Sequence, residues 1–246
     1  MSNVSLSLSG IPLSCDVQTT GTTSFLKDFI YQTSNPKAVV SVPEKLETAY
    51  LKNNSSTALT AADEYFLLHL VVSNALLPFN RCVFHGTAFL WHDKAWLFSA
   101  PSGTGKTTQY RQWRRLYRDE VKIINGDKPI LQFCDDGTIM VHPSPWKGKE
   151  RMASMLKAPL GGIIYLQQGK ENTIERMDSL EAAEPIYRQF LYMPETEEAV
   201  RRVCRMEDKL LRNIPVWKLV NKGDAQSAEL THHTLTKWLE ENPCTK

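Results

Sequence analysis

One short segment restricts the possible folds of this chain more than any other. Residues 100–107, Ala-Pro-Ser-Gly-Thr-Gly-Lys-Thr, follow a β-type run at 95–100 and lead into 106–117, whose pattern predicts a helix. A strand that turns through glycines into a helix aims backbone N–H groups and the positive end of the helix dipole at one point. The segment therefore predicts an α/β fold with an anion-binding loop at the end of a strand.

The residue types in this loop indicate which anion it binds. Gly103 and Gly105 let the backbone come within hydrogen-bonding distance of a polyphosphate, which bulky residues would prevent. Lys106 is placed to reach the β- and γ-phosphates, and the Thr107 hydroxyl to hold magnesium. This is the pattern of a phosphate loop (P-loop) with alanine at the first glycine position, and we expect ATP with Mg²⁺ as ligand. The expected nucleotide contacts are Ser102, Gly103, Thr104, Gly105, Lys106, Thr107 and Thr108.

Strand and helix signals divide the chain into two parts. Residues 1–57 form an N-terminal β-rich region that ends in a polar stretch, and residues 58–246 form the P-loop domain. In the second part helices interleave with strands, and a hairpin makes the expected sheet mixed rather than purely parallel. The expected strands are 82–91, 95–100, 121–125, 130–134, 138–142, 162–167, 173–177 and 216–220. The expected helices are 60–77, 106–117, 179–190, 195–212 and 224–240.

Two further residues near the loop are candidates for chemistry. Asp127 ends a run of apolar β-type residues shortly after the loop, where a carboxylate would lie beside the metal ion. It can bind magnesium or accept the proton of an attacking hydroxyl. His85 precedes Gly86 in the β-type run ahead of the loop. An isolated histidine in an apolar strand is more often a hydrogen-bonded core residue than a catalyst.

Three segments together resemble the HPr kinase/phosphorylase family. They are Phe84-His-Gly-Thr, Phe98-Ser-Ala-Pro-Ser-Gly-Thr-Gly-Lys-Thr-Thr and Ile124-Asn-Gly-Asp. The segments look more closely like those of the HPr-kinase-related proteins of peptide natural-product clusters, some of which phosphorylate serine on a precursor peptide. The resemblance implies a nucleotide core like that of phosphoenolpyruvate carboxykinase. It also implies that His85 lies near the transferred phosphate, that Lys106 and Thr107 contact nucleotide and metal, and that Asp127 is catalytic.

The chain departs from the family pattern after the second strand. Family members usually carry two adjacent aspartates there, whereas this sequence has Asp127 followed by Lys128. One carboxylate, either the metal ligand or the proton acceptor, is therefore missing. Glu150 and Asp136 are the residues that we consider as its replacement.

A loop at 142–150 takes the place of the segment with which HPr kinases recognise the carrier protein HPr. It is rich in turn formers and cations and contains one tryptophan, so we interpret it as an active-site loop rather than a plain connection. Its cations would hold an acidic or carboxylate-ended peptide, and Trp146 would offer a flat apolar surface. The expected substrate contacts are Ser144, Trp146, Lys147 and Lys149.

A competing signal lies near the C-terminus. Asn221-Lys-Gly-Asp224 follows a β-type run and matches the Asn-Lys-x-Asp element that reads guanine in GTPases. No Asp-x-x-Gly element lies between it and the glycine loop, and that element senses the γ-phosphate in those proteins. The four residues suit a strand-to-helix turn equally well, so we expect adenine to be preferred.

Composition excludes several kinds of partner. With 29 Lys and Arg against 27 Asp and Glu, a net charge of +2 gives no reason to expect nucleic acid or an anionic membrane. No stretch approaches the roughly 20 apolar residues of a membrane span, and no secretory signal is evident. The five cysteines are widely spaced without metal-ligand spacing, which favours reduced thiols in the cytoplasm.

Taken with the resemblance, the motifs predict an ATP- and Mg²⁺-dependent kinase that phosphorylates a hydroxyl, most simply a serine, on a peptide or small protein. A nucleotide-binding switch or ATPase without a phosphorylated product is the alternative from another class, and a small-metabolite kinase is the third. Because HPr kinases assemble into hexamers, the resemblance also allows a homo-oligomer.

Overall fold

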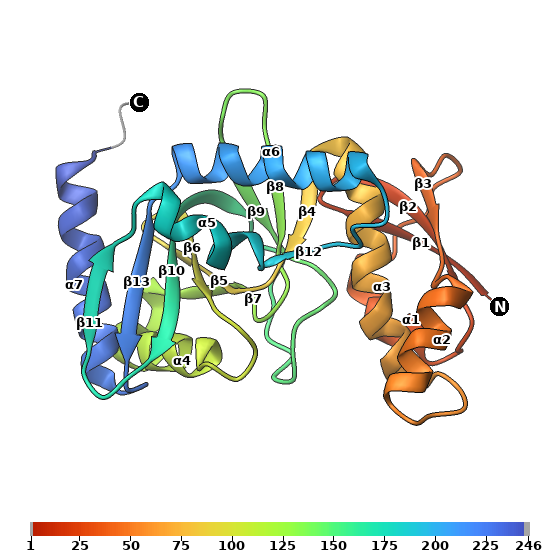
Figure 1. The fold of residues 1–246 in the computed structure, drawn as a ribbon, viewed down its shortest axis with the longest axis horizontal. Coiled ribbons are helices and arrows are strands. Elements are labelled where there is room, and N and C mark those ends of the chain that lie inside the picture. Colours follow the sequence, from red (N-terminus) through yellow and green to blue (C-terminus); the bar gives the residue numbers. More distant parts are fainter. Residues whose placement is uncertain (1, 244–246) are drawn as a thin grey trace.

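The computed structural model describes residues 2–243 and shows a mixed α/β protein with two sheets (Figure 1). A three-stranded sheet has the order β1-β2-β3, and a ten-stranded mixed sheet contains the path β12-β4-β8-β9-β10-β6-β5-β7, with β13 beside β10 and β11 beside β13. Figure 1 places the small sheet at one end of the molecule and α7 (Ala225–Glu241) at the other. The expected combination of a mixed sheet and a small N-terminal sheet is therefore present.

The N-terminal sheet follows from an alternation of polar and apolar residues. β1 (Ser2–Leu8) and β2 (Ile11–Val17) form an antiparallel hairpin, and β3 (Ala38–Val40) runs parallel to β2. Leu6 and Leu8 are almost fully buried, as period-2 alternation requires. The region also contains α1 (Thr22–Leu26) and α2 (Glu44–Asn53), which the sequence did not predict.

Helix α3 (Ala61–Leu76) connects the two sheets. It begins as predicted at Thr60, whose side chain accepts from the Asp63 N–H while the Asp63 carboxylate accepts from the Thr60 N–H. The apolar residues of α3 share one core with the N-terminal strands, and that core also includes Val83 of the large sheet and Trp146. Residues from both sides of position 57 therefore pack together.

A buried carboxylate fastens the segment before α1 to α3. Glu64 is fully buried, and it accepts hydrogen bonds from the N–H of Gln18 (2.6 Å), the N–H of Thr19 (3.0 Å) and the hydroxyl of Thr22 (2.7 Å). Burial raises the pKa of this carboxyl, but these hydrogen bonds outweigh it and hold the pKa below its usual value. The carboxylate thus fixes where α1 lies.

We expect Glu64→Gln to lower the free energy of unfolding by about 2 kcal/mol, because an amide turns an N–H toward donors and weakens charge-assisted bonds. Chemical denaturation at pH 7 measures the change. Glu44→Gln, an exposed substitution in the first turn of α2, is the control and should stay within about 0.5 kcal/mol of wild type. Equal effects of the two variants would contradict the anchoring role.

The strand that leads into the glycine loop, β6, lies between β10 and β5 in the large sheet. β5 (Thr87–Trp91) and β6 (Lys94–Ser99) form an antiparallel hairpin, and α4 (Lys106–Tyr117) and β7 (Lys122–Asn125) follow. The single strand predicted at 82–91 is wrong: β4 (Arg81–Phe84) and β5 are separate. Between them the N–H of His85 donates to Gln189 O and the N–H of Gly86 to Asp127 O, so the backbone leaves the strand ladder at this point.

The rest of the chain completes the large sheet and covers both of its faces. β10 is parallel to both β6 and β13, whereas β8 and β9 form the predicted antiparallel hairpin. Helices α5 and α6 contribute to one apolar cluster, and α4 and α7 contribute to another on the other face. These elements are β8 (Ile130–Phe133), β9 (Ile139–His142), β10 (Ala158–Gln168), β11 (Thr173–Arg176), α5 (Ser179–Tyr187), β12 (Phe190–Leu191), α6 (Glu197–Asn213) and β13 (Val216–Asn221).

Candidate active site

The glycine loop joins β6 to α4. Gly103 and Gly105 adopt left-handed backbone conformations, with φ of +83° and +112°. No atom outside the neighbouring residues lies within 4 Å of where a Cβ would stand on either glycine, so φ rather than crowding requires glycine here. The Thr104 hydroxyl donates to Pro101 O at 2.9 Å and closes the loop, while Ser102 and Gly103 are exposed.

Lys106 folds back beneath this loop. Its side chain is 7% exposed, and Nζ donates to Ala100 O at 2.8 Å and to Pro101 O at 3.2 Å. Burial lowers the pKa of the ammonium group to about 8, although the nearby Asp127 carboxylate opposes this shift. The cation is therefore held at the end of β6 by two carbonyl oxygens alone, which a phosphate oxygen can replace.

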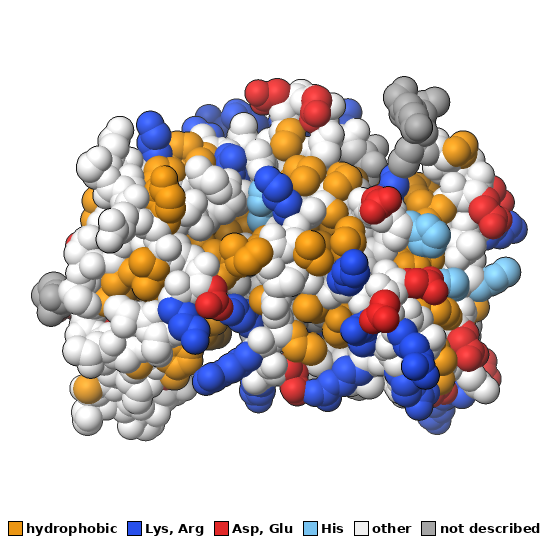
Figure 2. Space-filling view, turned by 180° about the vertical axis from the view of Figure 1, so that it is seen from behind, with side chains coloured by type: hydrophobic (Ala, Val, Ile, Leu, Met, Phe, Trp, Pro, Cys, Tyr) orange, Lys and Arg blue, Asp and Glu red, His pale blue; other side chains and the backbone are white. Residues whose placement is uncertain are grey.

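A cleft of about 1320 Å³ lies between this loop and the N-terminal part of the chain. The glycine loop forms one wall, α1 and α3 the opposite wall, and residues 126–128 and 145–151 lie between them. Six Lys or Arg and three Asp or Glu line the cleft, although the whole chain has a net charge of only +2. Figure 2 shows Lys and Arg side chains gathered in the lower half of one face. The cleft therefore favours an anionic ligand.

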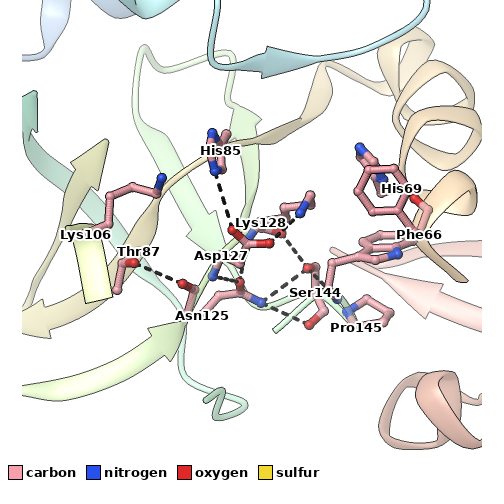
Figure 3. A network of polar contacts seen from close by, with 12 residues as sticks. Phe66, His69, His85, Thr87, Lys106, Asn125, Asp127, Lys128, Ser144 and Pro145 are labelled. Atoms are coloured by element: carbon pink, nitrogen blue, oxygen red, sulfur yellow. Dashed lines mark hydrogen bonds and ion pairs between the residues drawn. The ribbon is translucent and has the colours of Figure 1, made fainter. Parts of the chain in front are cut away.

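Asp127 lies on a turn whose conformation is fixed by the residues just before it (Figure 3). The buried Asn125 side chain accepts from the N–H of Asp127 (3.0 Å) and of Lys128 (2.8 Å) and donates to Ser144 O (3.0 Å). A Cβ on Gly126 would stand 2.8 Å from Lys147 O, so only glycine fits there. The turn holds the Asp127 carboxylate at a defined position in the cleft.

Each oxygen of the Asp127 carboxylate faces a side-chain nitrogen. Oδ1 lies 3.5 Å from His85 Nε2, and Oδ2 forms an ion pair with Lys128 Nζ. Burial raises the pKa of the carboxyl, but the His85 hydrogen bond and the Lys128 charge outweigh it and lower the pKa to about 2. Asp127 is therefore ionised at any pH near neutrality. A carboxylate of this kind is a strong anionic anchor and a weak proton acceptor.

His85 is held from its other side by a residue that the sequence did not identify. Its Nδ1 lies 3.2 Å from Gln189 Oε1, and the Gln189 amide is oriented by donation to Pro185 O at 3.1 Å. The His85 N–H donates to Gln189 O, and the Ser99 hydroxyl donates to His85 O. Both ring nitrogens thus face oxygen acceptors, which fixes the orientation of the ring. Gln189 follows α5 with no motif around it, so sequence patterns contain no signal for its role.

Two of the expected substrate contacts are buried. Ser144 is fully buried, and Trp146 is 2% exposed with Nε1 donating to Tyr65 O at 2.7 Å. The exposed indole surface expected from the sequence is absent, because the ring packs in the core that α3 shares with the N-terminal strands. Lys147 pairs with Asp28, while Lys149 is exposed and lines the cleft.

The residues considered as the missing second carboxylate lie in different places. Glu150 lines the cleft and pairs with Arg111 at 2.6 Å. Asp136 lies in the β8–β9 turn, is exposed and is not among the residues that line the cleft, so it does not meet Asp127. Asp28, just after α1, brings a further carboxylate that only the tertiary structure reveals.

The cleft contains few side chains that could bind a metal ion. Within residues 2–243, no group of three or more His, Cys, Asp or Glu side chains is placed to hold a metal ion. Thr107 and Asp127 nevertheless line the same cleft. One hydroxyl and one carboxylate fit an Mg²⁺ ion that arrives with a polyphosphate, since Mg²⁺ usually takes one or two protein carboxylates and fills its shell with phosphate oxygens and water.

The guanine-type motif has structural uses of its own. Asn221 is 4% exposed, and its side chain bonds Gln167 O and the Gly223 N–H. Asp224 caps α7 by accepting from the Ser227 N–H, and it also accepts from Asn172. Neither Asn221 nor Asp224 is among the residues that line the cleft. These contacts make the motif a strand-to-helix turn.

Comparisons with known proteins give a distant likeness. No protein-family model and no curated protein matches the chain. Among solved structures, it is similar to the HPr(Ser) kinase/phosphatase from Coxiella burnetii at 8% sequence identity, with 63% of this chain and 97% of that chain covered and a TM-score of 0.36. At this distance the likeness carries no functional argument, so the proposals below rest on the geometry of the cleft. In the described part of the chain, no helix has both the length and the apolar character to cross a membrane.

Proposed function

We propose that this protein is an ATP- and Mg²⁺-dependent kinase that transfers the γ-phosphate to a hydroxyl, namely a serine of a peptide or small protein. One observation carries the proposal: the glycine loop with its buried Lys106 and the His85–Asp127–Lys128 cluster line the same cleft. A donor site and a charged cluster that can orient the acceptor hydroxyl thus lie within one basic cavity.

The glycine loop binds the donor. Its backbone N–H groups and the N-terminus of α4 surround the phosphates, and Lys106 exchanges its carbonyl partners for phosphate oxygens. Mg²⁺ is held by Thr107 and Asp127 when it arrives with the nucleotide, and it supplies charge neutralisation at the phosphates. Adenine is the expected base because the side chains of Asn221 and Asp224 are already used in the fold.

Asp127 and its partners act on the transferred group. Because phosphoryl transfer passes through a loose transition state, catalysis depends more on positioning and charge than on a strong base. An Asp127 carboxylate with a pKa of about 2 fits that requirement, since it orients the acceptor hydroxyl and remains an anion. Lys128 places positive charge beside this carboxylate, where negative charge moves during transfer, and His85 contacts its other oxygen.

A direct test uses radiolabelled ATP with a library of serine-containing peptides, followed by calorimetry with ATP and GTP. The kinase proposal predicts labelled peptide and tighter binding of ATP. Hydrolysis without a labelled peptide would instead indicate a nucleotide-dependent switch, and label on a free metabolite would indicate a metabolite kinase. Tighter GTP binding would contradict the adenine assignment.

Gln189 gives a prediction about the cluster. Gln189→Ala removes the oxygen that faces His85 Nδ1, so the imidazole loses its orientation toward Asp127. We expect turnover to fall about tenfold while ATP affinity changes less than about twofold, as for loss of one hydrogen bond at the reacting centre. Gln189→Glu keeps an oxygen at this position and should restore much of the rate. A lower melting temperature with an unchanged rate per folded molecule would show that Gln189 is only structural.

A further inference from the structure

Helix α3 brings a second histidine to the cleft. His69 is 3% exposed and lines the cleft on the wall that α1 and α3 form. In the view of Figure 3, Asp127 and Lys128 lie between His69 and His85, so the two imidazoles flank the charged cluster. The two come from positions 16 residues apart, and no sequence motif links them.

The hydrogen bond of His69 defines which nitrogen is free. Nδ1 bonds the carbonyl oxygen of Phe66, one turn earlier in α3. A carbonyl only accepts, so Nδ1 carries the hydrogen, and a neutral imidazole then has a lone pair on Nε2. Burial lowers the pKa of His69 to about 4, which keeps the ring neutral at physiological pH. No residue in the described part of the chain hydrogen-bonds to Nε2.

His69 is 3% exposed as a whole residue, and the surface that it keeps includes Nε2, which opens into the cleft. The cleft is large enough for a substrate. The lone pair on Nε2 is therefore free to accept a hydrogen bond from a ligand bound there.

The side chains around His69 describe that ligand further. Phe66 is 45% exposed at the cleft, and its ring meets that of His69 edge to face at 5.0 Å. Lys128 Nζ lies 5.7 Å from the Phe66 ring centre and pairs with Asp127. An exposed apolar ring, a neutral hydrogen-bond acceptor and an ammonium group thus border one space beside the Asp127 carboxylate.

We propose that Phe66, His69 and Lys128 form the acceptor subsite, in which His69 Nε2 accepts a hydrogen bond from the acceptor and Phe66 packs against its apolar part. This inference rests on the proposed kinase function and deepens it. The lone pair selects a hydroxyl or amide N–H and disfavours a carboxylate, which cannot donate. The subsite thus matches a serine or threonine within a peptide that carries an apolar neighbour.

Two substitutions test the roles of the two ring nitrogens of His69 independently. His69→Asn places an amide near Nδ1 and can keep the bond to Phe66 O, but it leaves no atom at Nε2. His69→Gln reaches the Nε2 position and can present an oxygen there. For a serine peptide labelled by the wild-type protein, we expect His69→Asn to raise the peptide KM about tenfold and His69→Gln less than about threefold. The KM for ATP should stay unchanged in both.

A spectroscopic measurement tests the same idea without catalysis. The ¹⁵N shifts of the His69 ring should show hydrogen on Nδ1 and a bare Nε2, and adding the serine peptide should move the Nε2 signal. Hydrogen on Nε2 instead would overturn the inference, as would a peptide KM that does not change in His69→Asn. If the wild-type protein labels no peptide at all, the kinase proposal and this inference both fail. If it labels peptide while both variants match it, only the subsite is wrong.

Discussion

Lys106→Ala should leave a folded protein whose phosphoryl transfer is at least a hundredfold slower. Lys106 is the only Lys or Arg in the glycine-loop segment 100–107. Its ammonium group, which donates to Ala100 O and Pro101 O, is lost in this variant. Removing one preorganised charge from a transition state typically costs about 3 kcal/mol or more. Turnover with labelled ATP, nucleotide affinity by calorimetry and a circular dichroism spectrum together measure the effect.

Lys170→Ala is the matched control, because Lys170 is exposed between β10 and β11 and is not among the residues that line the cleft. It should turn over like the wild-type protein. If Lys106→Ala also keeps both its nucleotide affinity and its turnover, the glycine loop does not bind a polyphosphate and the central proposal fails.

Asp127→Asn should abolish most of the activity while much of the ATP affinity remains. The amide has the same shape but no charge, so it can neither anchor Mg²⁺ nor balance the Lys128 ammonium group. We expect a loss of about a hundredfold or more in turnover. Asp136→Asn, in the exposed β8–β9 turn outside the cleft lining, is the control. Turnover within about threefold of wild type would make Asp127 a turn residue only.

The same variant should also be less stable. The pKa of Asp127 is lowered from 3.8 to about 2, so the ionised carboxylate stabilises the fold above pH 4, and this contribution is lost as the pH falls toward 2. Asp127→Asn removes it at every pH, about 2 kcal/mol at pH 7. Denaturation of both proteins at pH 7 measures the difference, and activity is then compared per folded molecule.

Local patterns predicted much of the fold. The helix at Lys106–Tyr117, the hairpin of β8 and β9 and the capped start of α3 are confirmed, because each depends on neighbours within a few residues. Helix α2 was missed: none of its residues is fully buried, and Leu46 and Tyr50 are its apolar residues that pack against the core shared with α3. The break between β4 and β5 was missed because its cause lies in backbone bonds to Gln189 and Asp127, far along the chain.

Some residues of the candidate site could likewise be predicted from local patterns, and others could not. Glycine spacing, the lysine that follows it and an aspartate after the next strand are local features, and they are what indicated a phosphate-binding loop with Asp127 nearby. Whether the Trp146 side chain is buried or exposed could not be inferred from its neighbours in the sequence, which are turn formers and cations. It is buried because α3 packs over it. Only tertiary packing brings His69 and Asp28 to the cleft and places Gln189 against His85. Their contribution depends on which helix packs against which strand, and that is settled by burial of apolar surface over the whole chain rather than by any local pattern.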